Sequence, residues 1–143
     1  MNAIPLGAKG IFSMTVAPEH LASRFKDPTL PPVLATPLMI LFMENAALDA
    51  IREYLAPGES ALGTVVNVRH LAATPVGQRV TAEAIVTGVE GRRIVFAVTA
   101  RDETQEIGSG IHERALVDLR RLTERLDAKR NQQAGHPQSS DGA

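Results

Sequence analysis

Apolar and polar residues alternate along much of the chain, as they do in half-buried β-strands. In 10–16, Phe12, Met14 and Val16 fall on one face, while Ser13 and Thr15 fall on the other. The alternation recurs later, with short connections between the runs, in residues 62–72, 79–89, 92–101 and 107–119. The pattern therefore predicts one strand near the start of the chain and four antiparallel strands after residue 60.

One helix is expected between the first strand and the others. Thr36 precedes Pro37, an N-cap residue followed by proline at the first helical position, where a missing N–H costs nothing. The body runs from 38 to 55, and Pro57 and Gly58 end it. Residues 38–43 are apolar on every side, which predicts a helix surrounded by protein.

The order of these elements predicts an α+β fold. Before the helix, 17–34 contains Pro28, Pro31 and Pro32, so we expect a long loop there, of the kind that often has a function. A single sheet curled around one helix leaves an exposed edge and an exposed face. A second copy of the chain is a simple cover for both, so we expect a homodimer.

Composition narrows the functional classes. The 143 residues suffice for one domain with an aliphatic core, because 44% are hydrophobic and only 3% are aromatic. A net charge of -1 provides no overall field to attract nucleic acid or an anionic membrane. Without cysteine there is no disulfide and no thiol nucleophile. Residues 1–10 lack the pattern of a signal peptide, so we expect a cytoplasmic protein.

Glu44 is the first candidate for chemistry, because it interrupts an apolar stretch of the expected helix. Desolvating a carboxylate is unfavourable unless it finds a partner or its pKa rises, and groups with raised pKa values often serve in acid–base catalysis. Glu44 can equally begin the solvent-facing stripe of the helix with Asn45 and Asp49. The pattern alone does not separate these two interpretations.

His70 and Thr36 are further candidates. Alternation places His70 with Leu62, Val66 and Val68 on the inward face of its strand, where a lone histidine is more often a core residue than a catalyst. The hydroxyl of Thr36 is expected to cap the helix, and the helix start can also stabilise an oxyanion. No two histidines have the spacing of helical metal ligands, so we expect neither a metal site nor a cofactor.

Several segments together resemble the fluoroacetyl-CoA-type thioesterases of the hotdog superfamily. One is 35–44, ATPLMILFME, which resembles the start of the family's catalytic helix. Another is 63–77, GTVVNVRHLAATPVG, which resembles the strand that carries its active-site histidine. Segments 90–93, EGRR, and 106–115, EIGSGIHERA, resemble the later hairpin and the last strand. The resemblance runs over roughly 10–122.

This resemblance implies a hotdog fold, with a five-stranded antiparallel sheet wrapped around one long helix, and an acyl-CoA thioesterase. Thr36, Glu44 and His70 match the family's catalytic residues, while Gly63 and Arg114 match positions near the acyl group. The resemblance further implies that each active site forms between the two subunits of a homodimer. Glu44 would attack the thioester as a nucleophile or activate water as a base, and the sequence leaves both open.

The sequence departs from the family in the loop before the helix. Family members selective for fluoroacetyl groups carry phenylalanines there, whereas 26–34 contains none and Phe25 is the only one nearby. Pro37 also stands where those enzymes have glycine. A short or medium acyl-CoA is therefore the expected substrate.

Two other functions stay open at this point. A non-catalytic acyl-CoA sensor would keep the pocket without needing Glu44. An enoyl-CoA hydratase of the same superfamily would need a paired Asp and His in a hydratase motif, which the sequence lacks.

The polar end of the chain is expected to lie outside the fold. We expect a thioesterase-like domain over 1–122 and a polar tail over 123–143. Residues 122–130 can form a short helix, and 131–143 has the composition of a disordered end.

Overall fold

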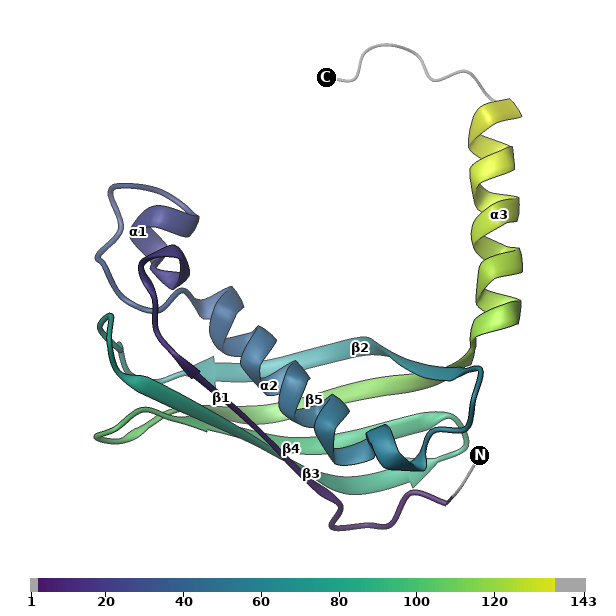
Figure 1. Cartoon of the computed structure of the whole chain (residues 1–143), viewed down its shortest axis with the longest axis horizontal. Helices are drawn as coiled ribbons and strands as arrows, with labels where there is room; N and C mark the ends of the chain where they lie inside the picture. The colour runs from purple at the N-terminus through teal and green to yellow at the C-terminus, as the bar shows by residue number, and fades with distance from the viewer. Residues whose placement is uncertain (1–2, 136–143) are drawn as a thin grey trace.

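The computed structural model of the chain describes residues 3–135 (Figure 1). Its five strands form one antiparallel sheet in the order β1-β3-β4-β5-β2. The sheet curls around a single long helix, α2, which lies across its concave face (Figure 1). The strands are β1 Lys9–Thr15, β2 Glu59–His70, β3 Arg79–Glu90, β4 Arg93–Arg101 and β5 Glu106–Asp118. The expected α+β architecture is confirmed.

The core lies between α2 (Thr36–Ile51) and the middle of the sheet. One face of α2 is buried through Met39, Phe42, Met43, Ala46, Ala47, Ala50 and Ile51. Alternation on β3 and β4 presents the even-numbered apolar residues to this face, which are Val80, Ala82, Ala84, Val86, Ile94, Phe96, Val98 and Ala100. Not every side of the helix is covered within one chain, because Leu41 is 43% exposed.

Small residues let α2 approach the backbone of β1 closely. Gly10 of β1 faces the helix, and a Cβ atom at Gly10 would overlap backbone atoms of Ala46 and Ala50. Ala46 and Ala50 are themselves almost completely buried. The position of the helix over the sheet therefore depends on the missing side chain of Gly10.

The start of α2 differs from the prediction. Ala35 is the N-cap residue, its side chain makes no capping hydrogen bond, and Thr36 is already the first helical residue. The Thr36 hydroxyl is therefore not a cap. At the other end, the α-helix stops at Ile51, and one 3-10 turn (η2, Arg52–Tyr54) continues it.

A β-bulge in β2 overturns part of the predicted alternation. The register against β5 shifts between Gly63, which faces Arg114, and Val65, which faces Glu113. Paired residues share a face of a sheet, so Leu62 lies outward with Ala115, whereas Val66 lies inward with His112. Leu62 was wrongly predicted to lie inward with Val66, because strict alternation cannot accommodate the extra residue of a bulge.

The segment before α2 is more ordered than the expected loop. It contains a 3-10 turn, η1 (Pro18–His20), and one helical turn, α1 (Ala22–Phe25). Isolated bridges link Leu21 to Leu34 and Val33 to Pro75, so the segment is fixed both to itself and to the β2–β3 connection.

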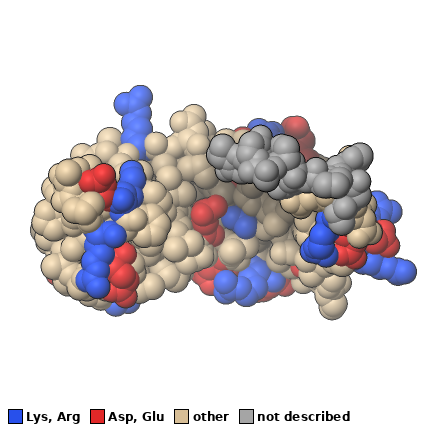
Figure 2. Space-filling model, turned by 90° about the horizontal axis from the view of Figure 1, so that it is seen from above, with Lys and Arg blue, Asp and Glu red and all other residues tan. Residues whose placement is uncertain are grey.

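The last described element is α3 (Leu119–Gly135), which projects away from the sheet (Figure 1). The helix begins earlier and ends later than the predicted 122–130. Residues 131–135 belong to α3, so the disorder expected there is wrong, and 136–143 lies outside the described residues. No helix within 3–135 is both long and apolar enough to cross a membrane. Figure 2 shows acidic and basic side chains interspersed on one face, outside the residues drawn in grey.

We expect Gly10→Ala to destabilise the fold by about 1–3 kcal/mol, because the new methyl group forces α2 away from the sheet. Urea unfolding of both proteins measures the difference in the free energy of unfolding. Gly88→Ala in β3 is the matched control, since its Cβ would meet only Val95 at ordinary contact distance. Equal stability of Gly10→Ala and the wild type would show that α2 does not depend on this close approach.

Candidate active site

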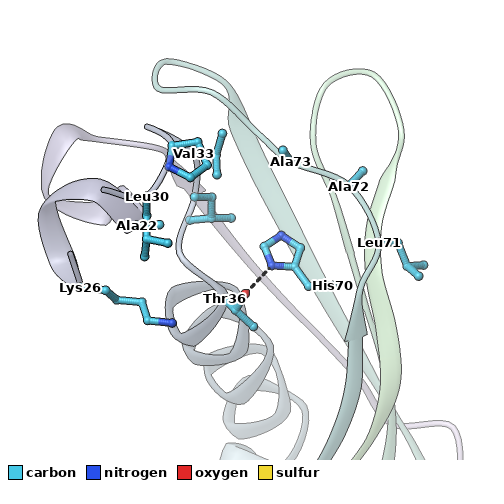
Figure 3. A pocket seen from close by; sticks show the side chains of 11 residues that line it. Ala22, Lys26, Leu30, Val33, Thr36, His70, Leu71, Ala72 and Ala73 are labelled. Carbon is cyan, nitrogen blue, oxygen red and sulfur yellow. Dashed lines mark hydrogen bonds between the residues drawn. The ribbon is translucent and has the colours of Figure 1, made fainter. Parts of the chain in front are cut away.

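A hydrogen bond joins two of the predicted site residues. The Thr36 Oγ1 atom lies 2.8 Å from His70 Nδ1. Thr36 is the first residue of α2 and His70 is the last residue of β2, so the bond connects the start of the helix to the end of an edge strand. Figure 3 shows the two side chains pointing toward one another beside a pocket.

The pocket beside this pair has a volume of about 390 Å³. Its wall is mostly apolar and comes from the segment before α2 and from the chain after β2. Besides Thr36 and His70 it is lined by Ala22, Lys26, Leu30, Pro31, Val33, Leu34, Leu71, Ala72 and Ala73. Phe25 is not among these residues and is 55% exposed. The pocket is therefore lined mainly by aliphatic residues, with no phenylalanine among them.

His70 is poised to remain neutral near pH 7. Burial lowers the pKa of its imidazole below the ordinary 6.5, although the neighbouring backbone of Ala72 opposes the shift. Its Nε2 atom is buried and has no hydrogen-bond partner among the described residues. The ring is therefore held at Nδ1 by the Thr36 hydroxyl, while Nε2 is enclosed by the chain.

A second cluster contains the other three predicted residues, and Gly63 is its centre. A Cβ atom on Gly63 would lie 3.2 Å from Glu44 Oε2 and 3.5 Å from Arg114 Nη1. The same atom would lie 3.4 Å from the Cε1 atom of His112. The absence of a side chain at Gly63 thus allows one carboxylate, one guanidinium and one imidazole to converge.

Arg114 is only 7% exposed, and two of its nitrogens have fixed partners. Nη2 donates to the carbonyl of Ala61 at 2.7 Å, and Nη1 lies 3.1 Å from His112 Nε2. Burial lowers the pKa of the guanidinium below its usual value, and the charge of Glu44 acts in the opposite direction. Its Nε atom is buried without a partner among the described residues. Arg114 therefore provides a fixed positive charge beside the Glu44 carboxylate.

His112 also belongs to this cluster, although the sequence patterns indicated no role for it. The signal was present in the alternation of β5, which places His112 two residues before Arg114 on the same face. His112 is 1% exposed and stacks on Phe96, with ring centroids 5.8 Å apart. Its pKa is lowered, first by burial and further by the charge of Arg114, against a raising contribution from its bond to Val65.

The structure does not bring all the predicted residues to one point within a chain. Thr36 and Glu44 lie eight residues apart on α2, which corresponds to about 12 Å along the helix axis. On β2, His70 pairs with Gly108 and Gly63 pairs with Arg114, which separates the two positions by about 20 Å. Within one chain the predicted residues therefore form two separate groups, the Thr36–His70 pair and the Glu44 cluster.

The remaining described histidine has a local structural role. His20 Nδ1 accepts a hydrogen bond from the backbone N–H of Ala17 at 2.8 Å, and its ring packs edge-on against Phe42. Within residues 3–135, no three His, Asp or Glu side chains are grouped closely enough to hold a metal ion.

Comparison with known proteins gives a consistent result over most of the chain. Residues 16–120 match the family model of the fluoroacetyl-CoA-specific thioesterase FlK. The fluoroacetyl-CoA thioesterase of Streptantibioticus cattleyicolor is 42% identical over 120 residues, which cover 80% of this chain and 86% of the relative.

Solved structures agree with this result. A structure of the fluoroacetyl-CoA thioesterase FlK superposes with a TM-score of 0.84 at 37% identity, over 90% of this chain and 98% of FlK. A Thermus thermophilus protein of the thioesterase superfamily gives a TM-score of 0.89 at 30% identity, over 95% of this chain and all of that protein (100%). A hotdog-like protein of Thermanaerovibrio acidaminovorans shares the fold, with a TM-score of 0.80 at 23% identity, over 88% of this chain and 93% of that protein. The predicted hotdog fold is confirmed.

We expect the free energy of unfolding to fall as the pH is lowered from about 7.5 to about 5.5. His70 and His112 both have a pKa below 6.5 when folded, so the unfolded chain binds protons first. Their contribution is complete above about pH 6.5 and is lost as the pH falls toward the folded values. The carboxyl groups with lowered pKa affect the free energy of unfolding only near pH 3.8–4.5 and below. These groups are Asp27, Asp102, Glu113 and Asp118.

Urea unfolding at several pH values between these limits measures the effect, with His70→Gln and His112→Gln for comparison. Each variant should lose less stability on acidification than the wild type. A wild-type stability that stays constant over this range would contradict the neutral state of the two histidines.

Proposed function

Because the chain belongs to the fluoroacetyl-CoA-specific thioesterase family, we propose that it hydrolyses a short or medium acyl-CoA through Glu44, His70 and Thr36. The products are the free acid and CoA. The observation that carries the proposal is the hydrogen bond between Thr36 and His70 at the edge of an apolar pocket, which suits the acyl end of a thioester.

Glu44 is the residue that acts on the thioester carbonyl or on water. As a nucleophile, its carboxylate adds to the carbonyl carbon, the C–S bond breaks to release CoA thiolate, and water then hydrolyses the resulting anhydride. As a base, it takes a proton from water while the water oxygen adds to the carbonyl carbon, and the C–S bond then breaks to release CoA thiolate. Both routes use the carboxylate form of Glu44, and the buried guanidinium of Arg114 lies beside that side chain.

Thr36 and His70 act on the other side of the reacting carbonyl. The N-terminus of α2 is the positive end of the helix dipole, which stabilises negative charge developing on the carbonyl oxygen. Pro37 has no N–H and the Leu38 N–H donates to Ala35, so the dipole and the side chain of Thr36 carry this role. The bond to Thr36 fixes the His70 ring through its Nδ1 atom at the edge of the pocket. From that position, His70 assists the proton transfer that completes release of the thiol.

The active site is proposed to form between two chains, because a single chain holds its halves too far apart. β2 is the last strand of the sheet, and Leu62, Val65 and Val66 on it are between 39% and 44% exposed. An exposed apolar edge strand favours pairing with another strand. A two-fold dimer through β2 uses this edge in both copies.

Antiparallel pairing of two β2 strands also joins the half-sites. If the two-fold axis lies near Val66 and Asn67, Gly63 of one chain comes opposite the partner's His70. The Glu44 cluster of each chain then meets the partner's Thr36 and the partner's His70. The homodimer contains two complete sites, and an isolated chain contains none.

The substrate range follows from the pocket wall. The relatives act on fluoroacetyl-CoA. Here the segment before α2 contributes Leu30, Pro31 and Val33 to the wall, with no phenylalanine among the lining residues. A wall of this kind accepts an apolar acyl chain without features that single out the fluoroacetyl group.

We expect Glu44→Gln to lower kcat about 10²–10⁴-fold, because glutamine neither attacks the carbonyl nor accepts a proton from water. Free-thiol release from a panel of acyl-CoAs of increasing chain length measures the change. Glu53→Gln is the control, since Glu53 is an exposed carboxylate in the 3-10 turn after the same helix. If the wild type binds CoA esters without hydrolysing any of them, a sensor role replaces the enzymatic one.

A complementation experiment tests the shared site. Glu44→Gln and His70→Ala are each inactive, but refolding them together should restore about a quarter of wild-type activity. Half of the dimers are then mixed, and each mixed dimer has one intact site of two. Refolding Thr36→Ala with His70→Ala is the control and should restore nothing, because both changes damage the same half-site. No recovery in the first mixture would place the whole site within one chain.

A further inference from the structure

The bulge in β2 exposes a backbone acceptor to a side chain of the neighbouring strand. The register shift between Gly63 and Val65 leaves Thr64 without a cross-strand partner. Next to it, the carbonyl of Val65 lies 2.8 Å from His112 Nδ1. Bulges interrupt the regular backbone ladder, and here the interruption is filled by an imidazole.

The two hydrogen-bond partners of His112 define its protonation state. A carbonyl oxygen can only accept, so Nδ1 carries a hydrogen and donates to Val65. A guanidinium can only donate, so Nε2 carries a lone pair and accepts from Arg114 Nη1 at 3.1 Å. His112 is therefore the neutral tautomer with its hydrogen on Nδ1.

The surroundings of His112 hold it in this arrangement. Its ring stacks on Phe96 at an interplanar angle of 22° and is 1% exposed. The charged groups that face it are Glu44 from α2 and Arg114 and Glu113 from its own strand. Burial and the guanidinium outweigh the two carboxylates and lower the pKa of the ring, which agrees with the neutral form.

We propose that His112 is a positioning residue, which transmits the geometry of the β2 bulge to Arg114 and so holds the guanidinium beside Glu44. This inference rests on the proposed role of Glu44. Arg114 has two anchors, the Ala61 carbonyl before the bulge and His112, which is itself anchored after the bulge. With both in place, Nη1 stays near the point at Gly63 where Glu44 Oε2 also lies.

Two amide substitutions that differ in length separate the two hydrogen bonds of His112. Glutamine can place its carbonyl oxygen near the position of Nε2 and still accept from Arg114. Asparagine reaches only the position of Nδ1, so it keeps a donor for Val65 but offers Arg114 no acceptor. We expect His112→Gln to retain kcat within about 3-fold, and His112→Asn to lose about 10- to 100-fold in kcat with little change in KM.

Phe96→Leu controls for a merely structural role. It removes the ring that stacks on His112 but leaves both hydrogen bonds of His112, so it should lower stability while keeping kcat near the wild-type value. If His112→Asn keeps its kcat, or if Phe96→Leu loses kcat to the same extent, the positioning role is wrong.

A measurement independent of activity tests the same inference. ¹⁵N NMR of the folded wild type, with the His112 signals assigned by their loss in His112→Gln, should show a protonated Nδ1 and an unprotonated Nε2 at neutral pH. A proton on Nε2 would overturn the proposal even if His112→Asn fails to fold. Absence of wild-type hydrolysis would instead refute the proposed function, so the two failures are distinguishable.

Discussion

The close approach of α2 to the sheet is the constraint on which the rest of the structure depends. Gly10 and the buried alanines of the helix let two backbones touch, so the helix cannot slide or rotate without steric overlap. That fixed helix presents Thr36 at its first turn and Glu44 two turns later. The positions of both parts of the candidate site therefore depend on the packing of α2 against Gly10, which involves no functional group.

Sequence patterns predicted the elements well where each residue acts locally. The alternation of β3 and β4 and the apolar run of α2 gave the core, because burial on one face imposes a simple period. The same reasoning failed at Leu62, since a bulge adds one residue without any mark in composition. The prediction that the Thr36 hydroxyl caps the helix was also wrong. This hydroxyl bonds to the imidazole of His70, 34 residues away in the sequence, rather than to the backbone of its own helix.

The site itself was predictable only in part, for a physical reason. Pattern alone left Glu44 and His70 undecided, and the family resemblance was needed to favour a catalytic role. Neither the pattern nor the family resemblance indicated a role for His112, because the role of a buried histidine is visible only when its hydrogen-bond partners are known. The proposed role of His112 depends on Val65, which is 47 residues away in the sequence, and on Arg114, which is 2 residues away. Only the register of the sheet brings these partners together. Cross-strand pairing is not encoded in the period of a single strand.

The proline-containing segment before α2 has a consequence for how ligands are admitted. Pro31 and Pro32 restrict the backbone, and bridges at Leu21 and Val33 attach the segment on both sides. A wall fixed in this way has little conformational entropy left to lose when a ligand enters. Binding of the acyl chain is then governed by the apolar area that it removes from water rather than by the ordering of a flap.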